Sequence, residues 1–336
     1  MPARATSVRR SPLPLRDAGR LVDALFDSAT ERTRAVFVSH VASTTGLVLP
    51  VDDVLARAGT LGLVTIVDGA HAPSQVPLDL DRLGADYYAG NLHKWLGAPK
   101  GAGFLHVGPE NQARVDAAIV SWGYVEGATF QERIERQGTR DPAAWLTVPD
   151  AIGFQAGRDW DDVRDRSRRL AHEARRDLCD LLGTEPLGPD AMVAQMAAVR
   201  LPRPCGGLSE RLFARHRVEI PVEDELLRLS VAGYTTREEI ERLLAALVRE
   251  LDPEHGQEDE HSEADRPVGE HAARMPRLPQ RGERDLPPEE NEADGGGSAD
   301  DDHGCEVRRF LERPRERPRR QRDEGENGRE GRRVAE

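Results

Sequence analysis

Short apolar runs alternate with amphipathic segments through the first 110 or so positions of the chain. Runs rich in β-branched and aromatic residues occur at 34–41, 62–68, 86–91 and 101–107. Apolar residues recur at helical spacing over 50–62, and a shorter helical pattern covers 78–85. Strands that alternate with short helices are typical of βαβ units. The pattern therefore predicts an α/β fold with a mostly parallel sheet over residues 1–150.

The pattern changes after Pro149. One long amphipathic helix is predicted at 161–183, followed by strand-like runs at 195–201, 216–222 and 226–232. A last helix begins at the capping box formed by Thr236 and Glu239 and has an apolar stripe up to Leu251. We expect a small α+β domain over 151–252.

Beyond Pro253 the composition is that of a disordered, low-complexity tail. Residues 253–336 contain blocks of both charges, abundant proline and glycine, and few apolar side chains. Such a segment buries too little apolar surface to offset the entropy lost on ordering. A basic run at 308–322 could contact an anionic partner, but a solvated tail is the simpler interpretation.

The formal net charge of −13 argues against a nucleic-acid groove, which needs clustered positive charge. No run approaches the roughly 20 apolar residues of a membrane span. The three cysteines show no metal-ligand spacing, so no metal is expected and a reducing cytoplasm is the predicted location. The composition thus argues against a nucleic-acid or membrane partner and is consistent with a cytoplasmic protein.

The chain has only two lysines, Lys94 and Lys100, both within 84–103; every other long basic side chain is arginine. Unlike arginine, lysine forms a Schiff base with an aldehyde, and burial can lower its pKa far enough for it to act as a base. Pyridoxal 5'-phosphate supplies such an aldehyde and also needs a carboxylate at its ring nitrogen. Asp68, at the end of an apolar strand, is the candidate, although it could simply cap the next turn. Lys100 is interpreted as part of a tight turn.

The segment 67–107 carries a specific resemblance. It contains Asp-Gly-Ala-His, then Gly-Asn-Leu-His-Lys-Trp, then Ala-Pro-Lys-Gly-Ala-Gly. These motifs resemble the core of the class V aminotransferase family, and most of all its isopenicillin N epimerase-like branch. The resemblance spans roughly 10–250. It implies a pyridoxal-phosphate transferase of fold type I, with 1–150 as the C-terminal portion of the cofactor-binding large domain.

The resemblance implies a role for each matching position. Lys94 would be the Schiff-base lysine, and Asp68 would bind the pyridine nitrogen. The other assignments are His71 and Ser43 beside the ring hydroxyl, Asn91 and His93 at the phosphate, Thr139 at the phosphate of a neighbouring subunit, and Arg228 at the substrate carboxylate. A residue shared between subunits implies a homodimer. Taken singly, each could also be a loop histidine or a surface residue.

The family's large domain normally starts more than a hundred residues earlier. We therefore expect an N-terminally truncated chain that lacks about half of the cofactor's surroundings, exposes apolar edges of its sheet and binds the cofactor poorly.

The predicted reaction is epimerisation at the α-carbon of an amino-acid substrate, with Lys94 as the base. A class V transaminase or lyase uses nearly the same residues and stays open. A cysteine desulfurase is disfavoured because no cysteine shortly precedes Arg228, and Cys205 lies too far upstream. An inactive remnant of such an enzyme stays open as well, as does a metal-dependent hydrolase built from Asp68, His71, His93 and His106.

Overall fold

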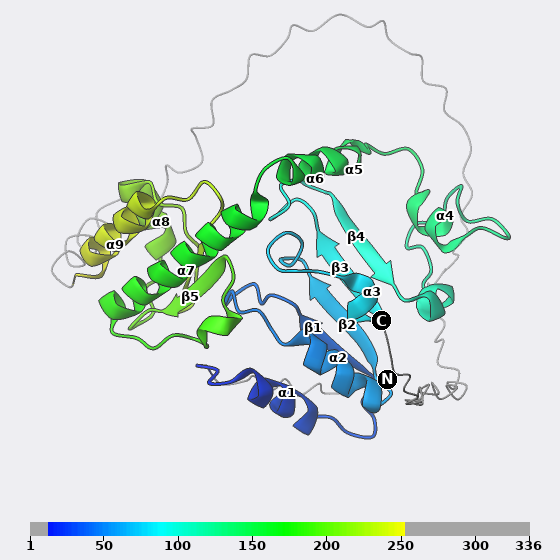
Figure 1. Cartoon of the computed structure of the whole chain (residues 1–336), viewed down its shortest axis with the longest axis horizontal. Coiled ribbons are helices and arrows are strands. Elements are labelled where there is room, and N and C mark those ends of the chain that lie inside the picture. Colours follow the sequence, from blue (N-terminus) through cyan, green and yellow to red (C-terminus); the bar gives the residue numbers. More distant parts are fainter. Residues whose placement is uncertain (1–12, 253–336) are drawn as a thin grey trace, which may run out of the picture. The chain divides into compact units, whose positions relative to one another are not determined.

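The computed structural model describes residues 13–252, whose helices and strands are labelled in Figure 1. The tail predicted over 253–336 lies outside the described residues. Within the described range, no helix combines the length and the apolarity that a membrane crossing requires.

A four-stranded sheet, in the order β1-β2-β3-β4, forms the first half of the fold. β1 and β2 are parallel, as are β2 and β3, whereas β4 runs antiparallel to β3. This arrangement confirms the predicted α/β fold with a mostly parallel sheet. The elements of this half, in chain order, are α1 (Ala18–Asp27), β1 (Ala35–Ser39), α2 (Val51–Thr60), β2 (Val64–Gly69), α3 (Leu80–Leu83), β3 (Tyr87–Asn91), β4 (Gly103–Val107), η1 (Pro109–Arg114), α4 (Phe130–Glu135), α5 (Ala143–Leu146) and α6 (Val148–Ala156).

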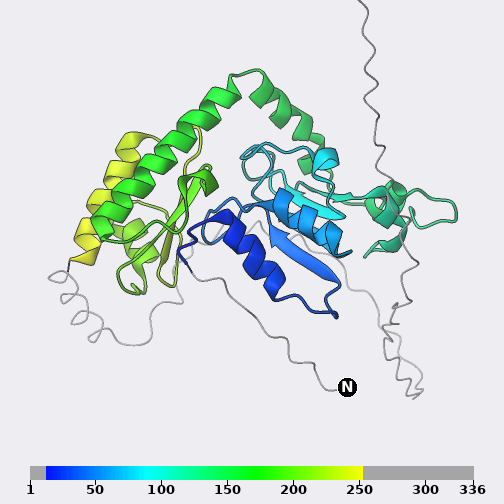
Figure 2. The same ribbon diagram turned by 60° about the horizontal axis from the view of Figure 1, so that its bottom comes forward.

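One face of this sheet is covered and the other is open. The helix α2 lies along the covered face (Figure 2). It contacts β1 and β2 and buries the apolar residues of its helical repeat, Val51, Val54, Leu55 and Ala58. On the opposite face, Phe37, Ile66 and Leu105 are 64%, 36% and 46% exposed. Because sheets with parallel strands are usually covered on both faces, this is an unusually open apolar surface.

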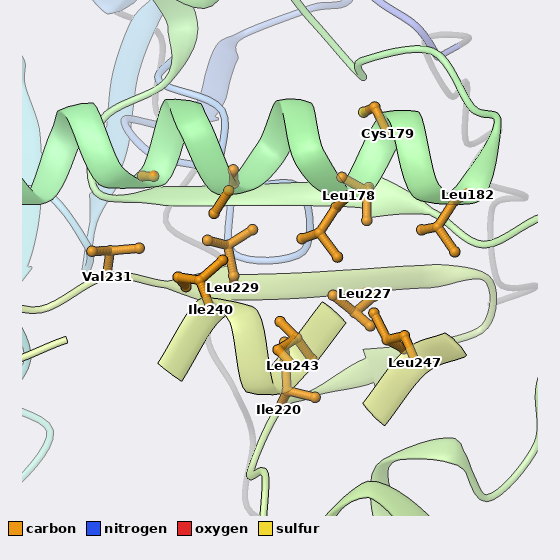
Figure 3. Packing of buried hydrophobic residues seen from close by; sticks show 14 of the residues in the cluster. Leu178, Cys179, Leu182, Ile220, Leu227, Leu229, Val231, Ile240, Leu243 and Leu247 are labelled. Atoms are coloured by element: carbon orange, nitrogen blue, oxygen red, sulfur yellow. The ribbon is translucent and has the colours of Figure 1, made fainter. Parts of the chain in front are cut away.

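A second, three-stranded antiparallel sheet has the order β5-β7-β6. It is accompanied by three helices whose apolar side chains join those of the strands in one cluster. Figure 3 shows this packing between α7, α9 and the strand β7. The elements are α7 (Trp160–Leu182), η2 (Asp190–Met192), β5 (Met196–Arg200), α8 (Leu208–His216), β6 (Val222–Glu223), β7 (Leu226–Ser230) and α9 (Arg237–Leu251). The capping box predicted at the start of the last helix is present, with Thr236 and Glu239 bonding each other's backbone N–H. The predicted boundary after residue 150 falls inside α6, and the division into domains stays a prediction.

The strand predicted over 216–222 is largely wrong. α8 extends to His216, and Arg217 ends it in the left-handed conformation with φ 56°. Pro221 lacks the N–H that a strand would use, so only Val222 and Glu223 pair with β7. The helix α8 was not predicted, because the apolar run at 216–222 was interpreted as a strand.

A loop after β1 joins the two sheets. Leu47 forms an isolated antiparallel bridge with Val193. Gly46 in this loop has φ 69°, and a Cβ there would lie 2.9 Å from the backbone carbon of Met196. Only glycine allows so close an approach in this conformation. The contact fixes the loop that carries Ser43 against the second sheet.

Leu178→Ala tests the second core. Leu178 is fully buried on α7, whereas Leu181, three positions later, is 40% exposed. We expect Leu178→Ala to lower the free energy of unfolding by about 2–5 kcal/mol, because it leaves a cavity. Leu181→Ala is the matched control and should cost less than about 1 kcal/mol. Chemical denaturation of the two variants measures both values, and equal losses would contradict the packing in Figure 3.

Candidate functional site

The carboxyl ends of β2 and β3 place the candidate residues at one edge of the first sheet. Asp68 is the next-to-last residue of β2, and Asn91 is the last residue of β3. His71 and Lys94 lie in the loops that follow these strands. Since the two strands are parallel and in register, both loops leave the sheet on the same side, where α/β proteins usually bind ligands.

Lys94 and His71 are in direct contact. The Lys94 Nζ lies 3.1 Å from the Nε2 of His71. On the other side of the imidazole, the indole Nε1 of Trp95 donates to Nδ1 at 3.4 Å. Gln75 holds the backbone of His71, because its side-chain amide donates to the His71 carbonyl at 2.6 Å.

Burial and opposing charges set the protonation of this pair. Lys94 keeps part of its side chain in solvent, yet desolvation lowers its pKa; Asp68 opposes the shift and Arg228 adds to it. Burial, with help from the positive charges of Lys94 and Arg228, lowers the pKa of His71 to about 4. His71 is therefore a neutral imidazole near neutral pH, and the Lys94 amine loses its proton more easily than a free lysine.

Arg228 reaches the same group from the second sheet. It lies on β7, and its Nη1 donates to the carbonyl oxygen of Ser43 at 2.7 Å and to the Ser43 hydroxyl at 3.2 Å. Its Nε is buried and has no hydrogen-bond partner among the described residues. A guanidinium with an unused donor beside a lysine is suited to binding a carboxylate.

Asp68 lies above a buried polar pair. Its Oδ1 accepts the N–H of Ala70 at 2.9 Å, which leaves the carboxylate with further lone pairs. Beneath it, the hydroxyl of fully buried Tyr88 is 2.9 Å from the Nδ1 of His40. Burial and the charge of Asp68 raise the pKa of Tyr88. A Cβ at Gly69 would lie about 2.1 Å from the Tyr88 ring, so this pairing requires the glycine of the Asp-Gly-Ala-His motif.

Gln155, on α6, ties the two loops together. Its amide donates to the carbonyls of Trp95 and Leu96, both at 3.1 Å, and its Oε1 accepts the hydroxyl of Ser74 at 2.5 Å. It thereby fixes the loop that carries Lys94 against the loop that carries His71. Trp95 stands in the Gly-Asn-Leu-His-Lys-Trp motif but was given no role, and nothing in the sequence pattern marked Gln155, because its partners lie in segments that are distant in sequence.

The two residues predicted to bind the phosphate, Asn91 and His93, lie at and just after the end of β3. Asn91 is half-buried at the end of β3. The Nδ1 of His93 lies 3.1 Å from the carbonyl oxygen of Ala102, which can only accept, so Nδ1 carries a proton. The Nε2 of His93 can then donate to an anion only when the ring is charged.

Three other predicted positions lie apart from this group or in solvent. Thr139 is exposed between α4 and α5, and in residues 13–252 no hydrogen bond joins it to the residues around Lys94. Lys100 is exposed in the turn before β4, as predicted. His106 lies within β4, and in the described part of the chain no three metal-ligating side chains converge. The four residues of the alternative metal site are thus not assembled.

The surroundings of Lys94 fit the predicted cofactor. A hollow of about 530 Å³ adjoins Lys94 and is lined mainly by apolar and aromatic side chains, among them Trp95, Phe154, Trp160 and Tyr234. Of the predicted site residues, the Lys94 amine lines this hollow, whereas the carboxylate of Asp68 and the guanidinium of Arg228 lie outside its lining and act on the amine through their charges. These are the groups that an aldehyde, a pyridine nitrogen and a substrate carboxylate need.

Comparisons with known proteins agree with the motifs. Residues 3–203 match the family model described as aminotransferase class V. The chain is 42% identical over 264 residues to an isopenicillin N epimerase from Amycolatopsis lactamdurans, and 40% identical over 253 residues to one from Streptomyces clavuligerus. The alignments cover 71% and 69% of this chain but only 66% and 64% of those proteins. The chain thus spans slightly less than two thirds of the length of these relatives.

Solved structures show the same fold. A cysteine desulfurase from Escherichia coli superimposes with a TM-score of 0.59 at 23% identity, over 68% of this chain and 62% of that one. A C-DES mutant, crystallised with glycine covalently linked to its PLP cofactor, superimposes with a TM-score of 0.57 at 23% identity, over 69% and 63%. At this level of identity the likeness establishes the fold, which is that of the pyridoxal-phosphate enzymes of fold type I. Since the family model covers more than half of the chain and its motifs stand at the ends of β2 and β3, the chain belongs to the class V aminotransferase family.

Proposed function

We propose that this chain is a pyridoxal-phosphate enzyme that acts at the α-carbon of an amino-acid substrate, most like an isopenicillin N epimerase. The observation that carries the proposal is the contact of the Lys94 amine with neutral His71, within electrostatic range of Asp68 and Arg228. Family membership and the fold support the same cofactor.

Each predicted cofactor-binding residue would contact a different part of the cofactor. Asp68 would bind the ring nitrogen of the cofactor and keep it protonated, and His71 and Ser43 would lie on the side of its ring hydroxyl. Asn91 and His93 would hold the phosphate. When bound, the cofactor supplies an aldehyde for an amine and a ring that withdraws electrons from the substrate's α-carbon.

Lys94 and Arg228 would handle the substrate. The guanidinium of Arg228 would bind the substrate carboxylate and so fix the α-carbon in place. The Lys94 Nζ, with its lowered pKa, takes the α-proton as a base. Inversion of the centre would then need a second proton donor on the opposite face of the α-carbon. A transaminase would instead pass the proton to the cofactor, and a lyase would expel a leaving group from the substrate's side chain.

A desulfurase mechanism is not part of the proposal. Of the two described cysteines, Cys179 is buried in α7, where burial raises the pKa of its thiol, and Cys205 lies in the loop after β5. Neither is among the side chains that meet at Lys94. A homodimer remains part of the proposal, because exposed Thr139 would serve the phosphate of a second subunit.

Borohydride trapping tests the role of the lysine. After incubation with pyridoxal phosphate and reduction with sodium borohydride, we expect a stable adduct on the peptide that contains Lys94, detected by mass spectrometry. Lys94→Ala should abolish the adduct. Lys100→Ala is the matched control, since it removes the other lysine of the chain, and should leave the adduct intact. An adduct on Lys100, or none on either lysine, contradicts the assignment.

The titration of His71 tests the electrostatics of the site. Its ring signals in NMR should titrate at pH about 4 rather than near the ordinary 6.5. Because the unfolded chain binds this proton at a higher pH than the folded one, the contribution of His71 to stability should fall as the pH drops from 6.5 towards 4. Thermal unfolding of the wild type and His71→Gln across this range measures the difference. A midpoint near 6.5 would show that the ring is not desolvated.

Incubation with amino acids in D₂O separates the reactions. An epimerase incorporates deuterium at the α-carbon and gives both configurations, without loss of the amino group. A transaminase yields the oxo acid, and a lyase releases part of the side chain. If oxo acid accumulates while the α-centre keeps its configuration, the epimerase proposal is wrong and a transaminase takes its place.

Substitutions of Arg228 test its role at the substrate carboxylate. Arg228→Gln should raise KM far more than Arg228→Lys, because lysine keeps the positive charge.

A further inference from the structure

The side chains of Trp95, His71 and Lys94 form a line in which each nitrogen lies within hydrogen-bonding distance of the next residue. The indole Nε1 of Trp95 lies 3.4 Å from the Nδ1 of His71, and the Nε2 of His71 lies 3.1 Å from the Nζ of Lys94. The motifs imply roles for His71 and Lys94 but none for Trp95. Its position along this line suggests one.

The protons on this line can be counted. An indole nitrogen only donates, so the Nδ1 of His71 accepts and carries no proton. The ring is neutral near pH 7, because its pKa is lowered to about 4, and its single N–H must then be on Nε2. This N–H points at Lys94, which can accept it only as a neutral amine. If Lys94 were an ammonium, it would donate to the lone pair of Nε2. The single N–H of the ring would then be on Nδ1, where it would face the indole N–H of Trp95, and two donors cannot bond each other.

We propose that Trp95 is a positioning residue: it fixes the tautomer of His71 with the proton on Nε2, and so holds Lys94 as a neutral, nucleophilic amine. The tautomer itself depends only on the geometry, whereas its use in binding an aldehyde rests on the proposed function. The role differs from that of a residue which merely fills space, because it depends on one N–H group.

The surroundings keep this line in place. The carbonyl of Trp95 accepts a hydrogen bond from Gln155, and the carbonyl of His71 accepts one from Gln75. The charged groups that act on His71 are Lys94 from the loop after β3, Arg228 from β7 and Asp68 from β2. Desolvation of the ring, the largest effect, and the positive charge of Arg228 disfavour its protonation even when Lys94 is neutral, and therefore favour the neutral form that the proton count requires.

The tautomer of His71 is measurable in the full-length protein without any cofactor. Long-range ¹H–¹⁵N NMR spectra at neutral pH distinguish a proton on Nε2 from one on Nδ1, and His71→Gln identifies the signals. We expect the Nε2–H form in the wild type. The Nδ1–H form would overturn the proposal, and this measurement needs no Trp95 variant to fold.

Trp95→Phe removes the indole N–H and keeps an aromatic ring. We expect the tautomer of His71 to shift towards Nδ1–H, and the second-order rate constant for capture of pyridoxal phosphate at pH 7 to fall about tenfold. Loss of one hydrogen bond is comparable with one unit of pKa on the amine. Trp145→Phe is the matched control, because its indole donates to the carbonyl of Gly103 at 3.3 Å, away from His71. An unchanged tautomer in Trp95→Phe, or equal changes in both variants, would overturn the proposal.

The two proposals fail separately. If the wild type shows the Nε2–H tautomer but forms no reducible adduct at Lys94, the proton arrangement stands and the cofactor assignment is wrong. If the adduct forms at Lys94 while the tautomer is Nδ1–H, the enzyme proposal stands and Trp95 has no part in it.

Discussion

The pKa of the Lys94 amine is set by two nearby groups of opposite charge, Asp68 and Arg228, and by partial burial. The chemistry of the site depends on the balance of these effects. Partial desolvation and the guanidinium of Arg228 disfavour the ammonium, whereas the carboxylate of Asp68 favours it. The first two prevail. An amine in this state is both a nucleophile towards an aldehyde and a base towards a carbon acid. Arginine in its place would keep its proton, so the role proposed for Lys94 requires a lysine at this position.

That balance requires loops held at fixed positions. The register of β2 and β3 brings their carboxyl ends to one edge of the sheet, but register alone does not fix the loops beyond. Gln155 does so by bonding two carbonyls of one loop and a hydroxyl of the other. Gly46 lets the loop that carries Ser43 pack against β5, and Ser43 in turn holds the guanidinium of Arg228. Each of these contacts joins segments that are distant in sequence, and the contacts of Gly46 and of Arg228 make the position of the Ser43 loop depend on the second sheet.

This dependence explains what could be predicted from the sequence. Alternation of apolar runs and helical patterns gave the parallel strands, and the strand ends gave the neighbourhood of Asp68, His71 and Lys94. Local signals also gave the capping box at Thr236. Contacts between distant segments left no such signal: Arg228 and Ser43 are 185 positions apart. α8 was missed because its apolar stripe is short, while the apolar run after it suggested a strand that Arg217 and Pro221 prevent from forming.

The open face of the first sheet bears directly on the site. Side chains alternate along a strand, so Asp68 lies on the same face of β2 as exposed Ile66, two positions before it. Phe37 and Leu105 extend this apolar surface across β1 and β4. Any protein surface that covers this face removes water from Asp68 as well. The attraction between its carboxylate and a positive ring nitrogen grows as the effective dielectric constant falls. Under the role proposed for Asp68, a surface that covers the sheet would therefore also strengthen the pairing of its carboxylate with the ring nitrogen.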